Sequence, residues 1–192
     1  MMKKLFFCVL FVSLSLFLWA AENTSQSLQQ NGQHESLPMG YGDIHLGMSV
    51  DDVKAALLKN HAFGYRGDRD VSFSPKDNQV LIETDGRFAA FSYFGRCWFQ
   101  FADGKLSVIT INLNDEKVDH YSVFTSLCQK YGGPNQLTPK KSQWQNDSVM
   151  MSLERPLSLK YIDAKVFADR QDKAKVEKTY GEQNREEFLK GL

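Results

Sequence analysis

The sequence contains little cysteine and none of the short motifs that bind metals or nucleotides. Its three cysteines, Cys8, Cys97 and Cys128, form no C-x-x-C pair, which excludes the common redox motif. None of the four histidines lies three or four residues from another histidine or from a cysteine, so the usual zinc spacings are missing. The G-x-S-x-G nucleophile elbow and the G-x-x-x-x-G-K-[ST] phosphate loop are missing as well. We therefore expect no cofactor, no metal and no catalytic residue, and we favour a protein that is not an enzyme.

The sequence also lacks an excess of charge of either sign. It has 23 Lys and Arg residues against 23 Asp and Glu residues. Removing residues 1–20 takes away Lys3 and Lys4 and no acid, which leaves 21 against 23 and a net charge of −2. Affinity for nucleic acid comes largely from neutralised phosphates. The composition therefore gives no reason to expect a nucleic-acid partner.

The N-terminus has the pattern of a secretory signal peptide. Lys3 and Lys4 precede an apolar run from position 5 to 21, and small residues stand at its end, Ala20 and Ala21. We interpret residues 1–20 as a cleaved signal peptide and expect a periplasmic or secreted protein. An uncleaved anchor is the alternative, although this run is at the short end of what spans a bilayer. A lipoprotein signal would need a cysteine just after the run, whereas Cys8 lies inside it.

The remaining chain divides by composition. Residues 21–40 are mostly polar and are expected to form a flexible leader, because such a segment buries too little apolar surface to order itself. Residues 41–168 are expected to fold as one α+β domain, with 41–114 and 115–168 as possible sub-units of one helix plus strands each. Residues 169–192 are charged and predict a C-terminal helix or tail.

Two helices are predicted from capping residues and apolar spacing. Ser49 is a hydroxyl cap followed by two acids, and apolar residues then recur at helical spacing up to Asn60. A second helix is predicted over 118–131, where a Gly-Gly-Pro run at 132–134 ends it.

An antiparallel meander is predicted between these helices. Asp85-Gly86 and Asp103-Gly104 are typical of two-residue hairpin turns, and Phe94-Gly95 marks a third turn. The turns separate predicted strands at 79–84, 87–93, 96–102 and 105–113. Further strands are predicted at 142–145, 149–154 and 158–168. The expected fold class is α+β, with helices packed on an antiparallel sheet.

Both faces of this meander would be apolar, so a helix, the other half of the chain or a partner must cover each of them. The turns would place Leu81, Ala90, Phe99 and Val108 in one cross-strand row. The opposite face would carry an aromatic cluster, made of Phe91, Tyr93, Trp98 and Ile109. Large aromatic residues are usually buried, so this cluster is either core or an exposed patch that binds a partner.

Cys97 and Cys128 would remain after signal cleavage. A helix packed on the sheet could bring them together, and an oxidising compartment would then allow a disulfide. Two buried free thiols are the alternative, since the sequence cannot establish the required spacing.

Residues 44–53 carry a family resemblance. The Gly47-Met48 step, the polar helix start at Ser49 and the following Val50 resemble the opening of BamE-type (SmpA/OmlA) outer-membrane assembly modules. The order of helix and hairpins is similar to that family and to the fold of β-lactamase-inhibitory proteins. This chain departs from the BamE pattern in having no lipobox, a longer meander and a second helix-plus-strand unit. The resemblance implies a non-catalytic envelope protein and transfers no site residues.

Together these features predict an exported, non-catalytic module that binds a protein or assists envelope assembly. We expect a protein partner, no nucleic acid, and membrane contact only through an uncleaved signal or a partner. An inhibitor or ligand-sequestering protein on the same scaffold is one alternative. A small hydrolase assembled from dispersed residues is the other.

Overall fold

The computed structural model describes residues 34–74 and 79–192, with backbone only for 174 and 176–181. The predicted signal peptide and most of the predicted leader lie outside the described residues. Within them, a small sheet comes first, formed by strands β1 (Gly40–Tyr41) and β2 (Ile44–His45). None of the described helices is both long and apolar enough to cross a membrane.

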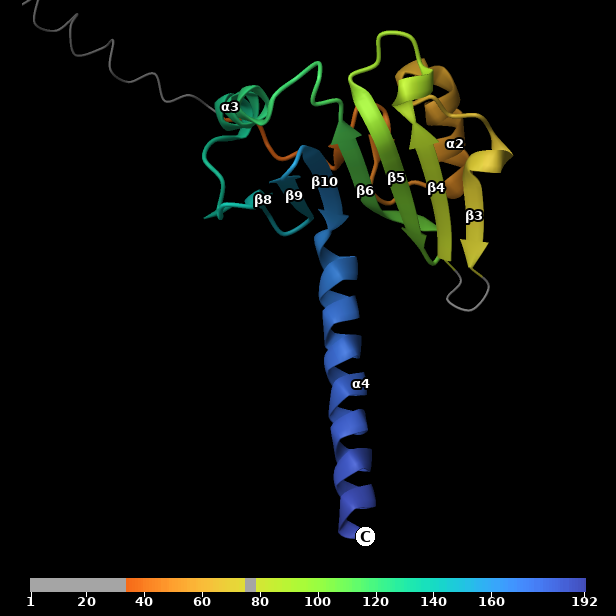
Figure 1. Ribbon diagram of the computed structural model, residues 1–192, viewed down its shortest axis with the longest axis vertical. Coiled ribbons are helices and arrows are strands. Elements are labelled where there is room, and N and C mark those ends of the chain that lie inside the picture. Colours follow the sequence, from red (N-terminus) through yellow and green to blue (C-terminus); the bar gives the residue numbers. More distant parts are fainter. Residues whose placement is uncertain (1–33, 75–78) are drawn as a thin grey trace, which may run out of the picture. The chain divides into compact units, whose positions relative to one another are not determined.

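Two successive units of one helix followed by four strands make up the body of the fold (Figure 1). The first unit consists of α2 (Val50–Lys59), β3 (Val71–Ser74), β4 (Gln79–Asp85), β5 (Phe94–Ala102) and β6 (Lys105–Leu113). The second consists of α3 (His120–Tyr131), β7 (Gln136–Leu137), β8 (Lys141–Gln145), β9 (Val149–Glu154) and β10 (Ser158–Asp163). Short 3-10 turns, labelled η2 (His61–Phe63), η3 (Asp68–Asp70) and η4 (Gly86–Phe88), lie within the first unit. Helix α4 (Ala164–Lys190) follows directly on β10.

The eight strands form one antiparallel sheet in the order β3-β4-β5-β6-β10-β9-β8-β7. The last strands of the two units, β6 and β10, pair at its centre, with Ile109 opposite Tyr161. The fold class is therefore α+β, as predicted. The sheet is continuous from one unit to the other, so both units contribute to the same two faces.

Helix α2 forms where the sequence predicts it. The Ser49 hydroxyl accepts a hydrogen bond from the backbone N–H of Asp52 at 3.2 Å, which satisfies one of the free amides of the first turn. Val53 and Leu57 on its inner side are almost completely buried. They belong to the same core as Phe99 of β5, so α2 covers the face of the sheet to which Phe99 points.

Helix α3 covers the same face in the second unit. Asp119 caps its first turn by accepting from the backbone N–H of Ser122 at 2.9 Å. The rings of Phe124 and Trp144 lie 6.2 Å apart, and Trp144 of β8 is buried. Because α2 and α3 lie on one side, the other side of the sheet has no helix packed across it in the described part of the chain.

The predicted meander is wrong between β4 and β5. Residues 87–93 form no strand, and β4 pairs directly with β5. The Asp85 carboxylate accepts from the backbone N–H of Arg87 at 3.0 Å and starts a 3-10 turn instead of a hairpin. Phe94 and Gly95 begin β5 and do not form a turn. Only the turn at 103–104 joins two paired strands as expected.

A β-bulge overturns the predicted cross-strand row. β5 and β6 start in the expected register, with Phe101 opposite Leu106, but Gln100 then lies opposite Val108. Ser107 is the extra residue, and its hydroxyl donates to the Gln100 carbonyl at 3.1 Å. Every side chain of β6 beyond the bulge is thereby moved to the other face relative to the prediction.

Strand β10 ends five residues earlier than predicted. The Asp163 carboxylate accepts from the backbone N–H groups of Lys165 and Val166, at 3.0 and 3.1 Å, and so caps α4. The described side chains of α4 from Phe167 to its end are exposed.

Candidate functional site

The predicted aromatic cluster is not assembled in the structure. Phe91 and Tyr93 lie in the connection between η4 and β5 and are exposed, Phe91 to 92%. Trp98 lies opposite Thr110, on the sheet face that is not covered by any helix of the described residues. Ile109 is fully buried on the helix-covered face. The cluster fails because residues 87–93 form no strand and because the bulge at Ser107 turns Ile109 to the core.

Of the two alternatives left open for the cysteines, the structure has free thiols and not a disulfide. Cys97 and Cys128 are both free thiols, Cys97 buried on β5 and Cys128 partly buried on α3. Helix α3 packs against β8 through Phe124 and Trp144, in the second unit, whereas Cys97 belongs to the first. Burial raises the pKa of the Cys97 thiol to about 12, so this thiol stays protonated and unreactive at neutral pH.

The sheet face opposite α2 and α3, here called the open face, carries alternating polar and apolar side chains. One row runs across the strands as Trp98, Thr110, Lys160, Ser152 and Gln143. The neighbouring row consists of Gln100, Val108, Ile162, Met150 and Gln145. Most of these side chains are partly exposed. Trp98, Val108, Ile162 and Met150 thus form an apolar centre between polar flanks.

Two grooves lie on the open face. The first has a volume of about 660 Å³ and is lined by Trp98, Val108 and Ile162 among others. The second has about 500 Å³ and includes Met150. Phe167, from the start of α4, lines both grooves. The first turns of α4 therefore border the apolar centre without covering it.

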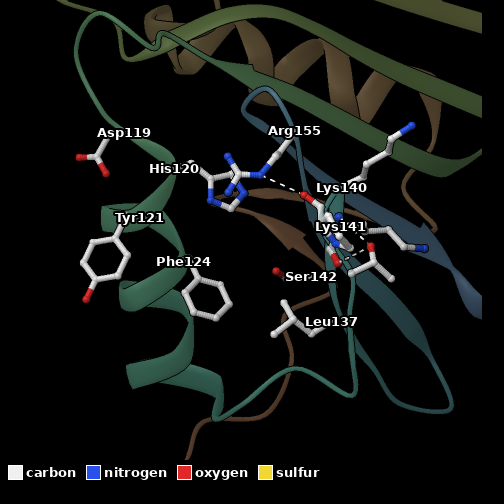
Figure 2. Close-up of a pocket in the computed structure, with 11 residues that line it drawn as sticks. Asp119, His120, Tyr121, Phe124, Leu137, Lys140, Lys141, Ser142 and Arg155 are labelled. Carbon is white, nitrogen blue, oxygen red and sulfur yellow. Dashed lines mark hydrogen bonds between the residues drawn. The ribbon is translucent and has the colours of Figure 1, made fainter.

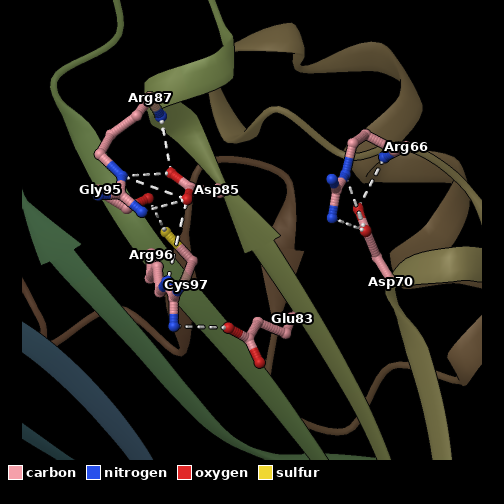
Figure 3. Close-up of polar contacts among 8 residues, drawn as sticks. All are labelled: Arg66, Asp70, Glu83, Asp85, Arg87, Gly95, Arg96 and Cys97. Carbon is pink, nitrogen blue, oxygen red and sulfur yellow. Dashed lines mark hydrogen bonds and ion pairs between the residues drawn. The ribbon is translucent and has the colours of Figure 1, made fainter.

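At one end of the open face, charged residues neutralise each other (Figure 3). Asp85 accepts from the Arg87 guanidinium at 2.6 Å, and Arg96 lies 3.5 Å from Glu83 and 3.9 Å from Asp85. The hydrogen bond from Arg87 holds the pKa of the Asp85 carboxyl below its usual range. This end of the face thus carries paired charges and no concentrated charge of one sign.

An exposed aromatic loop, residues 88–93, continues beyond that end. Phe88, Phe91 and Tyr93 are exposed, and Phe91 has a positive φ of 61°, which is unusual for a bulky residue. Ser92 fixes the loop, because its hydroxyl donates to the Ala62 carbonyl at 2.7 Å. The aromatic side chains are therefore held outward by a fixed backbone.

The ion pair between Arg66 and Asp70 supports this loop (Figure 3). The Asp70 carboxylate is fully buried and accepts from the Arg66 guanidinium at 2.6 Å and from the Arg66 backbone N–H at 2.8 Å. The Arg66 guanidinium in turn lies 5.2 Å from the centre of the Phe88 ring. Asp70 thereby positions the cation that contacts the loop.

A separate pocket of about 700 Å³ lies between α3 and β8, here called the α3–β8 pocket (Figure 2). Phe124 and Leu137 supply apolar walls, and Leu137 is 66% exposed. Arg155, in the turn between β9 and β10, crosses one end and donates from Nε to the Pro139 carbonyl at 3.1 Å. His120 lies beside it, and burial together with the nearby Arg155 charge lowers the pKa of the imidazole.

No feature of the sequence predicts this pocket. His120, Leu137 and Arg155 come from a helix, a two-residue strand and a turn, and no short motif connects them. Among the described residues, no group of three or more His, Cys, Asp or Glu side chains is placed to hold a metal ion.

Comparison with known proteins identifies a family. The model of a family described as the TP0088 domain matches residues 39–173, which include both helix-plus-strand units and the first ten residues of α4. No curated protein and no solved structure matches the chain. The matched region contains the open face and the α3–β8 pocket.

Proposed function

This chain belongs to the TP0088 domain family, and we propose that it is an exported, non-catalytic module that binds another protein through the open face of its sheet. Export rests on the basic start, apolar run and small-residue exit of residues 1–21. The corresponding location is periplasmic or secreted. The resemblance to BamE-type modules and to the β-lactamase-inhibitory-protein fold stays a prediction.

One observation carries the binding function: α2 and α3 lie on the same side of a continuous eight-stranded sheet. Antiparallel sheets with one solvated face usually present polar side chains there. Here the centre of that face is instead apolar, with Trp98, Val108 and Ile162 adjacent across β5, β6 and β10. A cluster of partly exposed apolar residues with a polar rim is typical of a protein interface.

The chemistry of the face indicates what kind of partner it fits. Lys160 is paired with Glu154 at 2.9 Å, and the arginines at the end of the face are paired with acids. Net charge therefore contributes little to recognition. A partner segment that places an apolar side chain beside Trp98 and hydrogen-bonding groups beside Gln100 and Gln143 would match the surface.

Position-specific photo-cross-linking in the intact cell envelope tests this proposal. A benzophenone amino acid at Gln100 or Gln145, both exposed on the open face, should yield one discrete adduct with another protein. The same amino acid at Leu58, exposed at 59% on α2, should yield none. Equal adducts from both sides of the molecule, or none from the open face, would contradict the proposal.

Substitution of the apolar centre gives an independent test. Trp98→Ala should reduce the adduct formed from position 145 at least about tenfold, because a central aromatic residue often contributes 2 kcal/mol or more to an interface. Leu58→Ala is the matched control and should leave the adduct unchanged. Circular dichroism of both variants verifies that they remain folded.

A further inference from the structure

The α3–β8 pocket is distinct from the open face, because its walls come from α3 and from the segment 137–142 that runs beside it. One wall, Phe124, is in ring contact with the buried Trp144, so the pocket is anchored to the core. Leu137 lies across from it and keeps most of its surface exposed (Figure 2). A volume of about 700 Å³ is within the range of pockets that hold small organic molecules.

One end of this apolar pocket is cationic. Arg155 uses Nε to hold the Pro139 carbonyl, and within the described ranges no further hydrogen bond or ion pair of its guanidinium is found. Its planar fork lies beside His120 (Figure 2). A guanidinium with free N–H groups matches a carboxylate, sulfonate or phosphate oxygen pair.

The other charged residues that line the pocket do not neutralise the positive charge at this end. The Asp119 carboxylate is engaged with the N–H and hydroxyl of Ser122, at 2.9 and 2.6 Å, and points away from the pocket (Figure 2). The ammonium groups of Lys140 and Lys141 lie on the far side of the strand from α3 (Figure 2). The Lys141 ammonium group donates a hydrogen bond to the side-chain oxygen of Gln143 at 2.7 Å. Arg155 thus carries the charge that faces the cavity, and the His120 imidazole lies beside it.

From this juxtaposition we propose that the α3–β8 pocket binds a small, dispersed anion with an apolar tail, its head on Arg155 and its tail between Phe124 and Leu137. The head replaces water on the free guanidinium N–H groups. The tail removes the exposed Leu137 side chain from water, which is favourable in proportion to the apolar area buried. Neither part alone uses both ends of the pocket.

Three probes separate the two contributions. Octane-1-sulfonate carries both parts, 1-octanol only the tail and methanesulfonate only the head. Titration calorimetry of the purified protein should show octane-1-sulfonate binding at least about tenfold more tightly than either of the others, since a charge-assisted hydrogen bond contributes about that factor or more. The His120 ring resonances in NMR spectra should shift on addition of octane-1-sulfonate and locate it in the pocket.

Substitutions at two exposed residues test the roles assigned to Arg155 and Leu137. Arg155→Gln should weaken the binding of octane-1-sulfonate at least about tenfold, so that its affinity comes close to that of 1-octanol. Leu137→Ser should weaken the sulfonate while leaving Arg155 in place. Arg69→Gln removes an exposed arginine outside the pocket lining and should leave affinity unchanged.

Several outcomes would overturn the proposal. Equal affinity for octane-1-sulfonate and 1-octanol would remove the role of charge. Equal loss in the Arg155 and Arg69 variants would show a non-specific charge effect. Sedimentation with phosphatidylglycerol vesicles that depends on Arg155, without binding of dispersed octane-1-sulfonate, would assign the pocket to a membrane surface instead.

Discussion

The indole N–H of Trp144 donates a 2.8 Å hydrogen bond to the carbonyl oxygen of Gly132, the residue that ends α3. Both groups are buried, so this bond connects the end of the helix to strand β8 inside the core. The bond thus joins α3 and β8, the two elements between which the α3–β8 pocket lies.

Trp144→Phe should lower the free energy of unfolding by about 1–3 kcal/mol, because a buried carbonyl loses its donor and the smaller phenyl ring leaves part of the site unfilled. Urea denaturation measures the change. Trp98→Phe, the same substitution on the open face, should cost clearly less. Equal losses would show that ring size, and not the hydrogen bond, is responsible.

Gly64 lies directly against the carbonyl of Asp85. It has a φ of +64°, and a Cβ placed there would lie 2.2 Å from that oxygen. Gly64→Ala should therefore destabilise by about 3 kcal/mol or more, through both backbone strain and a steric clash.

Gly42→Ala is the control for that substitution. Gly42 has nearly the same φ, +59°, but a Cβ there meets nothing within 4 Å. Gly42→Ala should therefore destabilise the protein only through backbone strain, by about 1 kcal/mol. Thermal unfolding of both variants separates the two contributions, and equal losses would contradict the clash.

Asp85 should make stability depend on acidic pH. Its pKa is lowered, chiefly by the hydrogen bond from Arg87, so its contribution is fully present above the unfolded value of about 3.9. That contribution is lost as the pH falls through the lower folded pKa.

Asp85→Asn should accordingly destabilise by about 1–3 kcal/mol at pH 7 and by less near pH 3. Urea denaturation at the two pH values measures this difference. Asp43→Asn, in the exposed turn between β1 and β2, should change the free energy of unfolding by less than about 0.5 kcal/mol. A loss for Asp85→Asn that is the same at both pH values would refute the linkage.

The two thiols should react differently with a maleimide. Cys97 is buried and its pKa is raised to about 12 by burial, whereas Cys128 is only partly buried, so Cys128 should be labelled first under native conditions. Cys97 should be labelled only after unfolding. Mass spectrometry of peptides assigns the labels, and absence of labelling at both sites in the unfolded protein would reveal a disulfide.

Binding of octane-1-sulfonate should strengthen as the pH falls. Burial, followed by the Arg155 charge, lowers the pKa of His120, so the free imidazole is neutral at pH 7. An anion beside it favours the protonated form and adds attraction below the ordinary value of about 6.5. The other titratable or charged groups around the pocket are Asp119, Tyr121, Lys140, Lys141 and Arg155.

Calorimetric titrations from pH 8 to 5 measure that dependence, since the sulfonate stays ionised throughout. His120→Gln should flatten the profile while leaving binding at pH 8 nearly unchanged. A profile that keeps its slope in this variant would assign the titration to another group.

Local signals explain the elements that sequence analysis predicted well. The cap at Ser49 and the helical spacing after it define α2, and the strand predicted over 149–154 is β9. Where a predicted element is wrong, a local hydrogen bond stabilises a different conformation from the one that the residue pattern predicts. An Asp-Gly pair predicts a hairpin at 85–86, but the Asp85 side chain bonds to Arg87 and starts a 3-10 turn.

The sequence by itself determined the helices that became α2 and α3 and the antiparallel class of the sheet, because caps, spacing and turns act over a few residues. Only the tertiary structure decided which residues share a face. The bulge at Ser107 sends Ile109 to the core, and the pairing of β6 with β10 joins the two units into one open face. The tertiary structure also decided that Arg155 lies beside His120. Strand pairing and helix packing bring these two residues together, and no short sequence pattern connects residues so far apart along the chain.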